Sequence, residues 1–344
     1  SHICNNISRA YKLPYSSLSA ESLARLPNTN TETNTPTQPS EIKFVNIKEQ
    51  PGWFKRALAV PYKDKTVICD GVDIHYLLWS DDTTKPGLVL VHGNGAHAHW
   101  WTFLAPFFMD HYQILAIDLS GAGDSGRRSR YTTEAFAAEI NAAADDAGFG
   151  NDTIIVGHSF GGYITLRTGL LYRHRLEGVV LVDSAVRPPD FEWERDPRRS
   201  PIKAKRIYES FNAALARFRL MPPQDCDNSY LLDYIGRHSI MEVDEGWTWK
   251  FDDTMFEKFE FGENMHEDLA KLKVRVGVVY GEDSYLFSQE IADFMFEVLD
   301  KSVPFVGIPE AQHHLFLDQP LAFVSSLRTL LAEWRHSRPQ RVHP

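Results

Sequence analysis

From about residue 41 onward, the hydrophobic pattern of this chain alternates between short apolar runs and longer amphipathic stretches. The short runs have the length and β-branched content of buried strands; they are residues 67–69, 74–79, 88–92, 113–118, 153–157, 179–183, 274–280 and 303–308. The longer stretches carry apolar residues every three or four positions, which predicts helices at 133–146, 162–172, 288–299 and 319–334. Strand–helix alternation of this kind predicts an α/β fold with a doubly wound, mostly parallel sheet. The first two runs flank Asp70 and Gly71 and predict an antiparallel hairpin.

Two parts of the chain depart from this alternation. Residues 1–40 include the segment 28–40, NTNTETNTPTQPS, which has no apolar residue and cannot contribute to a core. We interpret 1–40 as a disordered tail and linker; its Ser-rich, acid-poor start faintly resembles a transit peptide. Residues 187–270 are much longer than a crossover between strands requires, and an unstructured loop of that length would be unusual. They predict an inserted helical cap, with 202–218 as its clearest helical stretch, between core parts 41–186 and 271–344.

Composition excludes several classes of function. The 344 residues include 36 Lys and Arg against 46 Asp and Glu, giving a formal net charge of −10, whereas a dedicated nucleic-acid-binding protein normally carries a basic surface. The three cysteines are scattered, and the sequence has no CxxC or HExxH motif. No apolar run approaches the roughly 18 residues of a membrane span. We therefore expect a cytoplasmic protein that binds no nucleic acid and has no transmembrane segment, metal or cofactor.

The strongest chemical motif is Gly157-His158-Ser159-Phe160-Gly161, which matches G-x-S-x-G. It lies where a predicted strand ends and a predicted helix begins, and a serine on so sharp a turn is held out toward a substrate. The N–H groups at the start of the following helix can stabilise an oxyanion. An ordinary tight turn is the alternative reading, but the flanking elements favour a nucleophile at Ser159.

A serine hydroxyl needs a base, because it is a weak nucleophile at neutral pH. The loop after the last predicted strand carries Gln312-His313-His314, where the topology would place a histidine near the serine. Either histidine fits this role on position alone, and a surface histidine is the alternative explanation.

Four stretches together resemble the cap-bearing type of the α/β-hydrolase family: VHGNGAH at 91–97, DLSGAGDS at 118–125, GHSFGG at 157–162 and QHHLFLDQP at 312–320. The resemblance extends from about residue 41 to the C-terminus. In that family an acid and a proline usually follow the catalytic histidine at five and seven residues, which selects His313 through Asp318 and Pro320. The resemblance also implies that the backbone N–H groups of Asn94 and Phe160 form the oxyanion hole.

The third member of the implied triad has two candidate positions, because the chain departs from the family pattern there. The family usually carries its acid in Gly-x-x-Asp after the next-to-last strand, but here Gly281 is followed by Glu282, Asp283 and Ser284. Asp283 thus lies one residue before the position where the family has its acid, which Ser284 occupies here. Other family members carry the acid one strand earlier, which corresponds to Asp183. Asp183 and Asp283 are both candidates, and each could instead be a structural or solvated acid.

A serine in this position favours acyl transfer through a covalent acyl-enzyme. The leading interpretation is a serine carboxylesterase whose small-molecule ester substrate has an apolar portion. A carbon–carbon-bond hydrolase of diketone-like acids is the second interpretation, with Arg187, Arg195, Arg198 and Arg199 as candidate partners for the substrate acid. The third is a non-catalytic small-molecule receptor on the same fold.

Overall fold

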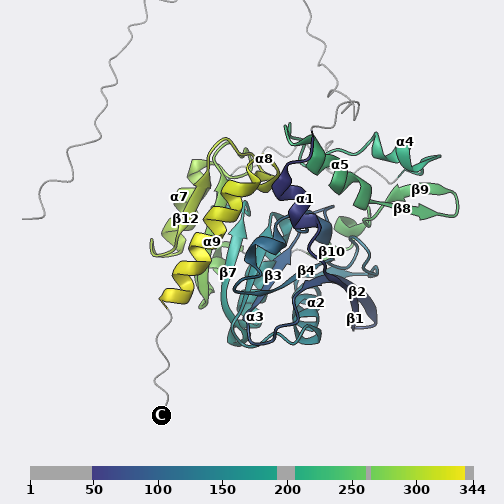
Figure 1. Ribbon diagram of the computed structural model, residues 1–344. Helices are drawn as coiled ribbons and strands as arrows, with labels where there is room; N and C mark the ends of the chain where they lie inside the picture. The colour runs from purple at the N-terminus through teal and green to yellow at the C-terminus, as the bar shows by residue number, and fades with distance from the viewer. Residues whose placement is uncertain (1–48, 192–205, 261–264, 338–344) are drawn as a thin grey trace, which may run out of the picture. The chain divides into compact units, whose positions relative to one another are not determined.

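The computed structural model describes residues 49–191, 206–260 and 265–337 (Figure 1); the predicted tail and linker at 1–40 lies outside them. Its main sheet has eight strands in the order β1-β2-β4-β3-β6-β7-β11-β12. Their bounds are β1 Lys63–Cys69, β2 Val72–Trp79, β3 Gly87–Val91, β4 Gln113–Ile117, β6 Thr153–His158, β7 Leu176–Val182, β11 Arg275–Gly281 and β12 Phe305–Ile308. Each corresponds to one of the eight apolar runs in the sequence.

The sheet is mostly parallel, as the strand–helix alternation predicts. β1 pairs with β2 and β2 with β4 in antiparallel register, and the six strands from β4 to β12 are parallel. Asp70 and Gly71, with φ of 48° and 76°, form the turn between β1 and β2, a conformation that suits a tight hairpin. The predicted α/β class is therefore confirmed.

Helices precede, connect and follow the strands. They are α1 Gly52–Leu58, α2 Thr133–Asp146, α3 Phe160–Leu171, α6 Met265–Lys271, α7 Gln289–Val298, α8 Leu315–Asp318 and α9 Pro320–His336, with 3₁₀ turns at Ala98–Trp100, Ala105–Phe108 and Arg173–Arg175. Helix α2 begins where its sequence signal predicts, because the Thr132 hydroxyl accepts from the Ala135 N–H at 3.0 Å. The connection from β3 to β4 holds only the first two 3₁₀ turns in place of an α-helix.

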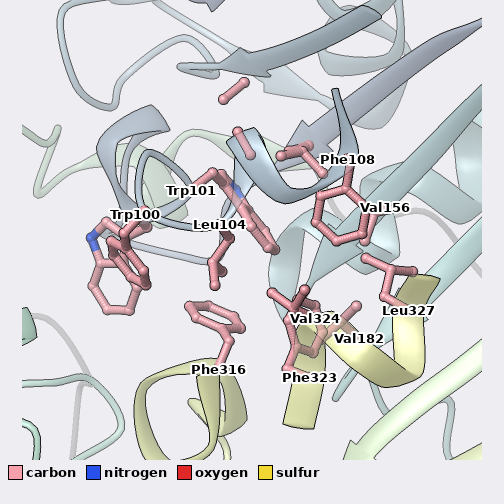
Figure 2. Packing of buried hydrophobic residues seen from close by; sticks show 14 of the residues in the cluster. Trp100, Trp101, Leu104, Phe108, Val156, Val182, Phe316, Phe323, Val324 and Leu327 are labelled. Carbon is pink, nitrogen blue, oxygen red and sulfur yellow. The ribbon is translucent and has the colours of Figure 1, made fainter. Parts of the chain in front are cut away.

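The sheet is covered by apolar side chains on both faces, because successive residues of a strand point in opposite directions. Leu88 and Leu90 of β3 belong to one cluster of buried residues, and Val89 and Val91 belong to another. Figure 2 shows part of the first cluster, in which Phe323, Val324 and Leu327 of α9 pack with Trp101, Leu104 and Val182. Both faces of the central strands are thus buried, which explains their unbroken apolar sequences.

Residues 206–260 follow the description of a helical cap only in part. Helix α5, Ser229–His238, is regular, but α4 is confined to Phe211–Leu215. Residues 202–205, the start of the predicted helix 202–218, lie outside the description. The segment also contains the antiparallel pair β8 Ile240–Val243 and β9 Gly246–Trp249, which the sequence prediction missed. A short strand, β10 Phe259–Glu260, pairs with β5 Tyr131–Thr132. The expected helical cap is therefore not helical at 240–249, where Gly246 at φ 137° permits the hairpin turn.

Across residues 49–191, 206–260 and 265–337, none of the helices combines the length and apolarity that a bilayer crossing requires.

Candidate active site

Ser159 lies on a strained turn between β6 and α3. Its φ of 54° and ψ of −120° fall outside the regions that a serine normally occupies. The flanking glycines permit this turn: a Cβ on Gly157 would lie 2.2 Å from Thr165 Oγ1, and one on Gly161 would lie 2.3 Å from the carbonyl oxygen of His92. The motif therefore has a steric basis, and it leaves the Ser159 side chain at the carboxyl end of the sheet.

The structure brings His313 and Asp183 to Ser159 in a hydrogen-bonded chain. The Ser159 hydroxyl donates to Nε2 of His313 at 3.0 Å, and Nδ1 of His313 donates to Oδ2 of Asp183 at 2.6 Å. The His313 and Asp183 side chains are buried, with 2% and 0% of their surface exposed. A nucleophile, a base and an orienting carboxylate in this order can generate an alkoxide-like serine.

The Asp183 carboxylate accepts hydrogen bonds from three donors, one of which is His313, and its backbone is held as well. It follows β7 with a φ of 44°, and its N–H donates to the carbonyl of Val279 at 2.8 Å. The Gly281 N–H donates to Oδ1 at 3.1 Å, and the Ser284 hydroxyl donates to Oδ2 at 2.7 Å. Together with His313 these donors hold the carboxylate in position.

The alternative acid Asp283 lies outside this array. Its side chain is exposed, and its backbone N–H donates to the carbonyl of Ala311 at 3.0 Å. The chain turns after β11 so that the buried side chain of Ser284, not that of Asp283, reaches the Asp183 carboxylate. The geometry therefore selects Asp183 over Asp283 as the partner of His313, and the departure from Gly-x-x-Asp places a hydroxyl where the family usually has an acid.

Two serines of the site were not singled out from the sequence as site residues. Ser284 contacts Asp183, and the Ser184 hydroxyl donates to the carbonyl of Ser159 at 2.8 Å. Serines following apolar strands are common, so their sequence context alone gives no signal. Only the position of Ser284, three residues after Gly281, could have drawn attention to it.

The two predicted oxyanion donors lie on the loop after β3 and at the first residue of α3. Neither the Asn94 N–H nor the Phe160 N–H donates a hydrogen bond to another group among the described residues. His92 holds the loop after β3 through both of its ring nitrogens. Nδ1 donates to the carbonyl of Gly93 at 2.7 Å, and Nε2 accepts from the Leu119 N–H at 3.1 Å. Burial lowers the pKa of His92, which keeps the ring neutral for both roles.

The turn that begins at Asp118 has a structural role. Asp118 accepts from Nδ1 of His75 at 2.6 Å, from the Ala98 N–H at 2.6 Å and from the Asp124 N–H at 2.9 Å. A Cβ on Gly123 would lie 2.1 Å from the Asp118 carboxylate, so this turn requires a glycine. Through its bond to the Ala98 N–H, the buried Asp118 carboxylate thus fixes the chain shortly after Asn94.

Two groups of side chains have the composition of metal ligands. In the first, His75, Asp118 and Asp124, the acids are already engaged, since Lys250 Nζ contacts Asp124 at 2.6 Å. In the second, His158, His313 and His314, both ring nitrogens of His313 belong to the chain with Ser159 and Asp183, and Nε2 of His158 donates to the carbonyl of His313 at 3.0 Å. Internal hydrogen bonds therefore account for the central members of both groups.

Comparison with known proteins is consistent with this geometry. The profile of the alpha/beta hydrolase family matches residues 88–326. The chain is 22% identical over 285 residues to a 2-hydroxy-6-oxo-6-(2'-aminophenyl)hexa-2,4-dienoic acid hydrolase of Metapseudomonas resinovorans, covering 79% of this chain and 91% of the relative. It is 23% identical over 260 residues to a pimeloyl-(acyl-carrier protein) methyl ester esterase of Aliivibrio fischeri, covering 74% and 97% of the two chains.

Solved structures show the same fold. An E-2-(acetamidomethylene)succinate hydrolase matches with a TM-score of 0.65 and 17% identity, over 79% of this chain and 100% of that one. An esterase from Mycobacterium tuberculosis matches with a TM-score of 0.62 and 20% identity, over 81% and 95%. The family profile covers well over half of the residues, and all four stretches that carry the resemblance lie within or overlap it. The chain belongs to the alpha/beta hydrolase family.

Proposed function

We propose that the protein is a serine hydrolase that cleaves carboxylic esters through Ser159, His313 and Asp183. The observation that carries the proposal is the hydrogen-bonded chain from Ser159 Oγ through the His313 ring to the Asp183 carboxylate. The strained φ of Ser159 supports it further, because such strain persists mainly where function requires the presented side chain.

In the proposed reaction, Ser159 Oγ attacks the ester carbonyl carbon while Nε2 of His313 takes the hydroxyl proton. The carbonyl oxygen becomes an oxyanion that accepts from the N–H groups of Asn94 and Phe160, and one such donor contributes about 3 kcal/mol to the transition state. The imidazolium then protonates the leaving alcohol as the carbon–oxygen bond breaks. Water, deprotonated by His313, releases the acid from the acyl-enzyme and restores Ser159.

Substrates with an apolar portion fit the surroundings of the nucleophile. Phe160 directly follows Ser159, and its ring lies 5.7 Å from that of Phe256 and 5.4 Å from that of Phe259, measured between centroids. Both partners come from the segment that we assign to the cap, residues 187–270. The esterase and lipase names of several relatives support an ester substrate.

A carbon–carbon-bond hydrolase is the second candidate, because one relative of nearly full length is named for a dienoic acid substrate. Such a substrate carries a carboxylate that a cation would have to bind. Of the four arginines considered for this role, Arg187 lies within the description, with its guanidinium 5.9 Å from the ring centroid of Phe191. Arg195, Arg198 and Arg199 lie outside it.

The test combines substrate turnover with active-site labelling. We expect hydrolysis of p-nitrophenyl esters of graded acyl length, and fluorophosphonate modification of Ser159 identified by peptide mass mapping. Ser159→Ala should abolish both, while Ser80→Ala, a change in a loop serine remote from the site in sequence, should change neither. Labelling at another residue would overturn the mechanism. Labelling without ester turnover, combined with cleavage of a 2-hydroxy-6-oxo-dienoate, would favour the second candidate, and absence of both would favour a receptor.

A further inference from the structure

The loop that carries His313 is hydrogen-bonded to a segment of residues 224–228, which belongs to the proposed cap. Gln224 Nε2 donates to Oδ1 and Oδ2 of Asp318, at 3.0 Å each, and Gln224 Oε1 accepts from the His314 N–H at 2.8 Å. Asn228 Nδ2 donates to the carbonyl of Leu317 at 2.7 Å. The side chain of Gln224 therefore uses both ends of its amide on this loop.

Asp318 completes the arrangement from the other side of the base. Its Oδ2 accepts from the Gln312 N–H at 2.8 Å. Gln312 and His314 lie immediately before and after His313, and their peptide N–H groups are both held by one amide–carboxylate pair. We refer to Gln224 and Asp318 as the clamp pair.

The pair differs from an ordinary surface contact in its chemistry. Both oxygens of a charged carboxylate face one amide, and hydrogen bonds to an ionised group are stronger and shorter than neutral ones. Burial, together with the nearby charges of Asp227 and Asp283, raises the pKa of the Asp318 carboxyl, and the bonds from Gln312 and Gln224 oppose that rise. The carboxylate consequently depends on its donors in this partly buried position.

On the basis of the proposed function, we propose that Gln224 is a positioning residue for His313, holding its backbone through the clamp pair so that Nε2 stays within reach of Ser159. The base lies near the end of the chain, whereas Gln224 belongs to the inserted segment. The geometry of proton transfer therefore depends on that segment being in place. A displacement of about 1 Å in a reacting group can lower a rate about 10²-fold.

An exchange of the amide and the carboxylate tests this assignment. Gln224→Glu keeps an acceptor for the His314 N–H but sets two carboxylates against each other. Asp318→Asn keeps an acceptor for the Gln312 N–H. The double variant Gln224→Glu/Asp318→Asn restores an amide–carboxylate pair with the two roles reversed.

We expect Gln224→Glu to lower kcat for a p-nitrophenyl ester, and the rate of fluorophosphonate labelling at Ser159, by about 10- to 100-fold. KM should stay within about 2-fold, because the clamp pair bonds to the peptide groups that flank His313. The double variant should recover kcat to within about 3-fold of the wild type. Gln224→Met, which removes both polar contacts without adding charge, should lose kcat as the first variant does and cannot be rescued by Asp318→Asn.

Asn228→Ala is the matched control, because it loosens the same two segments without contacting either peptide group that flanks His313. If the two variants have equal thermal stability, kcat should fall less in Asn228→Ala than in Gln224→Met. Equal losses in these two variants, or wild-type kcat in Gln224→Met, would overturn the positioning role. Failure of the wild type itself to turn over esters or label at Ser159 would instead overturn the proposed function.

Discussion

Nε2 of His158 donates to the backbone carbonyl of His313 at 3.0 Å. The residue before Ser159, the proposed nucleophile, thus bonds to His313, the proposed base, and the ring centroids of the two histidines lie 4.8 Å apart. The His158 side chain is almost fully buried, and burial lowers its pKa well below the usual value, so the ring is neutral. This contact fixes the turn at Ser159 to the loop of His313, in addition to the bonds that the clamp pair makes to that loop.

His158→Phe should therefore destabilise the protein and slow catalysis together. The ring volume is approximately kept, but the carbonyl of His313 loses its buried donor, which costs about 1–3 kcal/mol. Urea unfolding at pH 7.5 measures the change in free energy of unfolding, and ester turnover measures kcat. His174→Phe, in the 3₁₀ turn after α3, is the control and should leave both unchanged. Unaltered stability in His158→Phe would show that the contact contributes nothing.

The two candidate acids should respond very differently to conversion to amides. Asp183→Asn places an amide against Nδ1 of His313 and favours the wrong tautomer, so kcat should fall by roughly 10⁴-fold. Asp283 is exposed and has no contact with the ring, so Asp283→Asn should stay within about 2-fold of the wild type. Steady-state kinetics on folded variants, checked by circular dichroism, decide between them. Comparable small losses would mean that neither carboxylate orients the base.

Ser284 supports the same carboxylate, and its removal should have an intermediate effect. Ser284→Ala deletes the donor that lies 2.7 Å from Asp183 Oδ2, the oxygen that also accepts from His313. Loss of one hydrogen bond to a charged group costs about 1.5–3 kcal/mol, so kcat should fall about 10- to 100-fold. Ser284→Thr retains the hydroxyl and should keep most of the activity. If the threonine variant were no better than the alanine variant, the hydroxyl would not be the relevant group.

The sheet could be predicted from the sequence because each central strand is buried on both faces and is therefore apolar throughout. All eight strands lie at the predicted runs, and α2 has the bounds that its pattern predicts. The turn at Ser159 could also be predicted, because the glycines that it requires for steric reasons are visible in the sequence motif. The β8–β9 hairpin was missed because its residues alternate only over four positions and it packs within the small cluster around Leu215 and Ile240.

The choice of acid could not be predicted for a different reason. Asp183 and Asp283 both follow strands at the same sheet edge, and one residue of difference in a turn decides which side chain reaches His313. That difference depends on the hydrogen bonds from Gly281 and Ser284, which join parts of the chain far apart in sequence. Gln224 was missed for the same reason, because its hydrogen bonds to His314 and Asp318 also join parts of the chain that are far apart in sequence.

Buried neutral histidines make the folded state sensitive to acid. Burial lowers the pKa of several of them, to about 3 for His99 and below the usual value for the others: His92, His97, His158, His238 and His314. The unfolded chain takes up protons at these side chains below a pH of about 6.5, whereas the folded protein does not. The contribution of these histidines to stability is consequently complete above that pH and falls as the pH decreases, by at most about 1.4 kcal/mol per pH unit for each histidine.

We therefore expect the free energy of unfolding in urea to be nearly constant from pH 8 to 7 and to fall steeply between pH 6.5 and 5. His75 acts in the opposite direction, because its hydrogen bond to Asp118 raises its pKa although burial opposes this. Its contribution to stability is therefore present at low pH and lost as the pH rises.

His99→Phe should flatten the acid slope of the free energy of unfolding by about 1.4 kcal/mol per pH unit, since one uncharged buried imidazole is removed. A wild-type stability that does not change between pH 7.5 and 5 would contradict the neutral state of these buried rings.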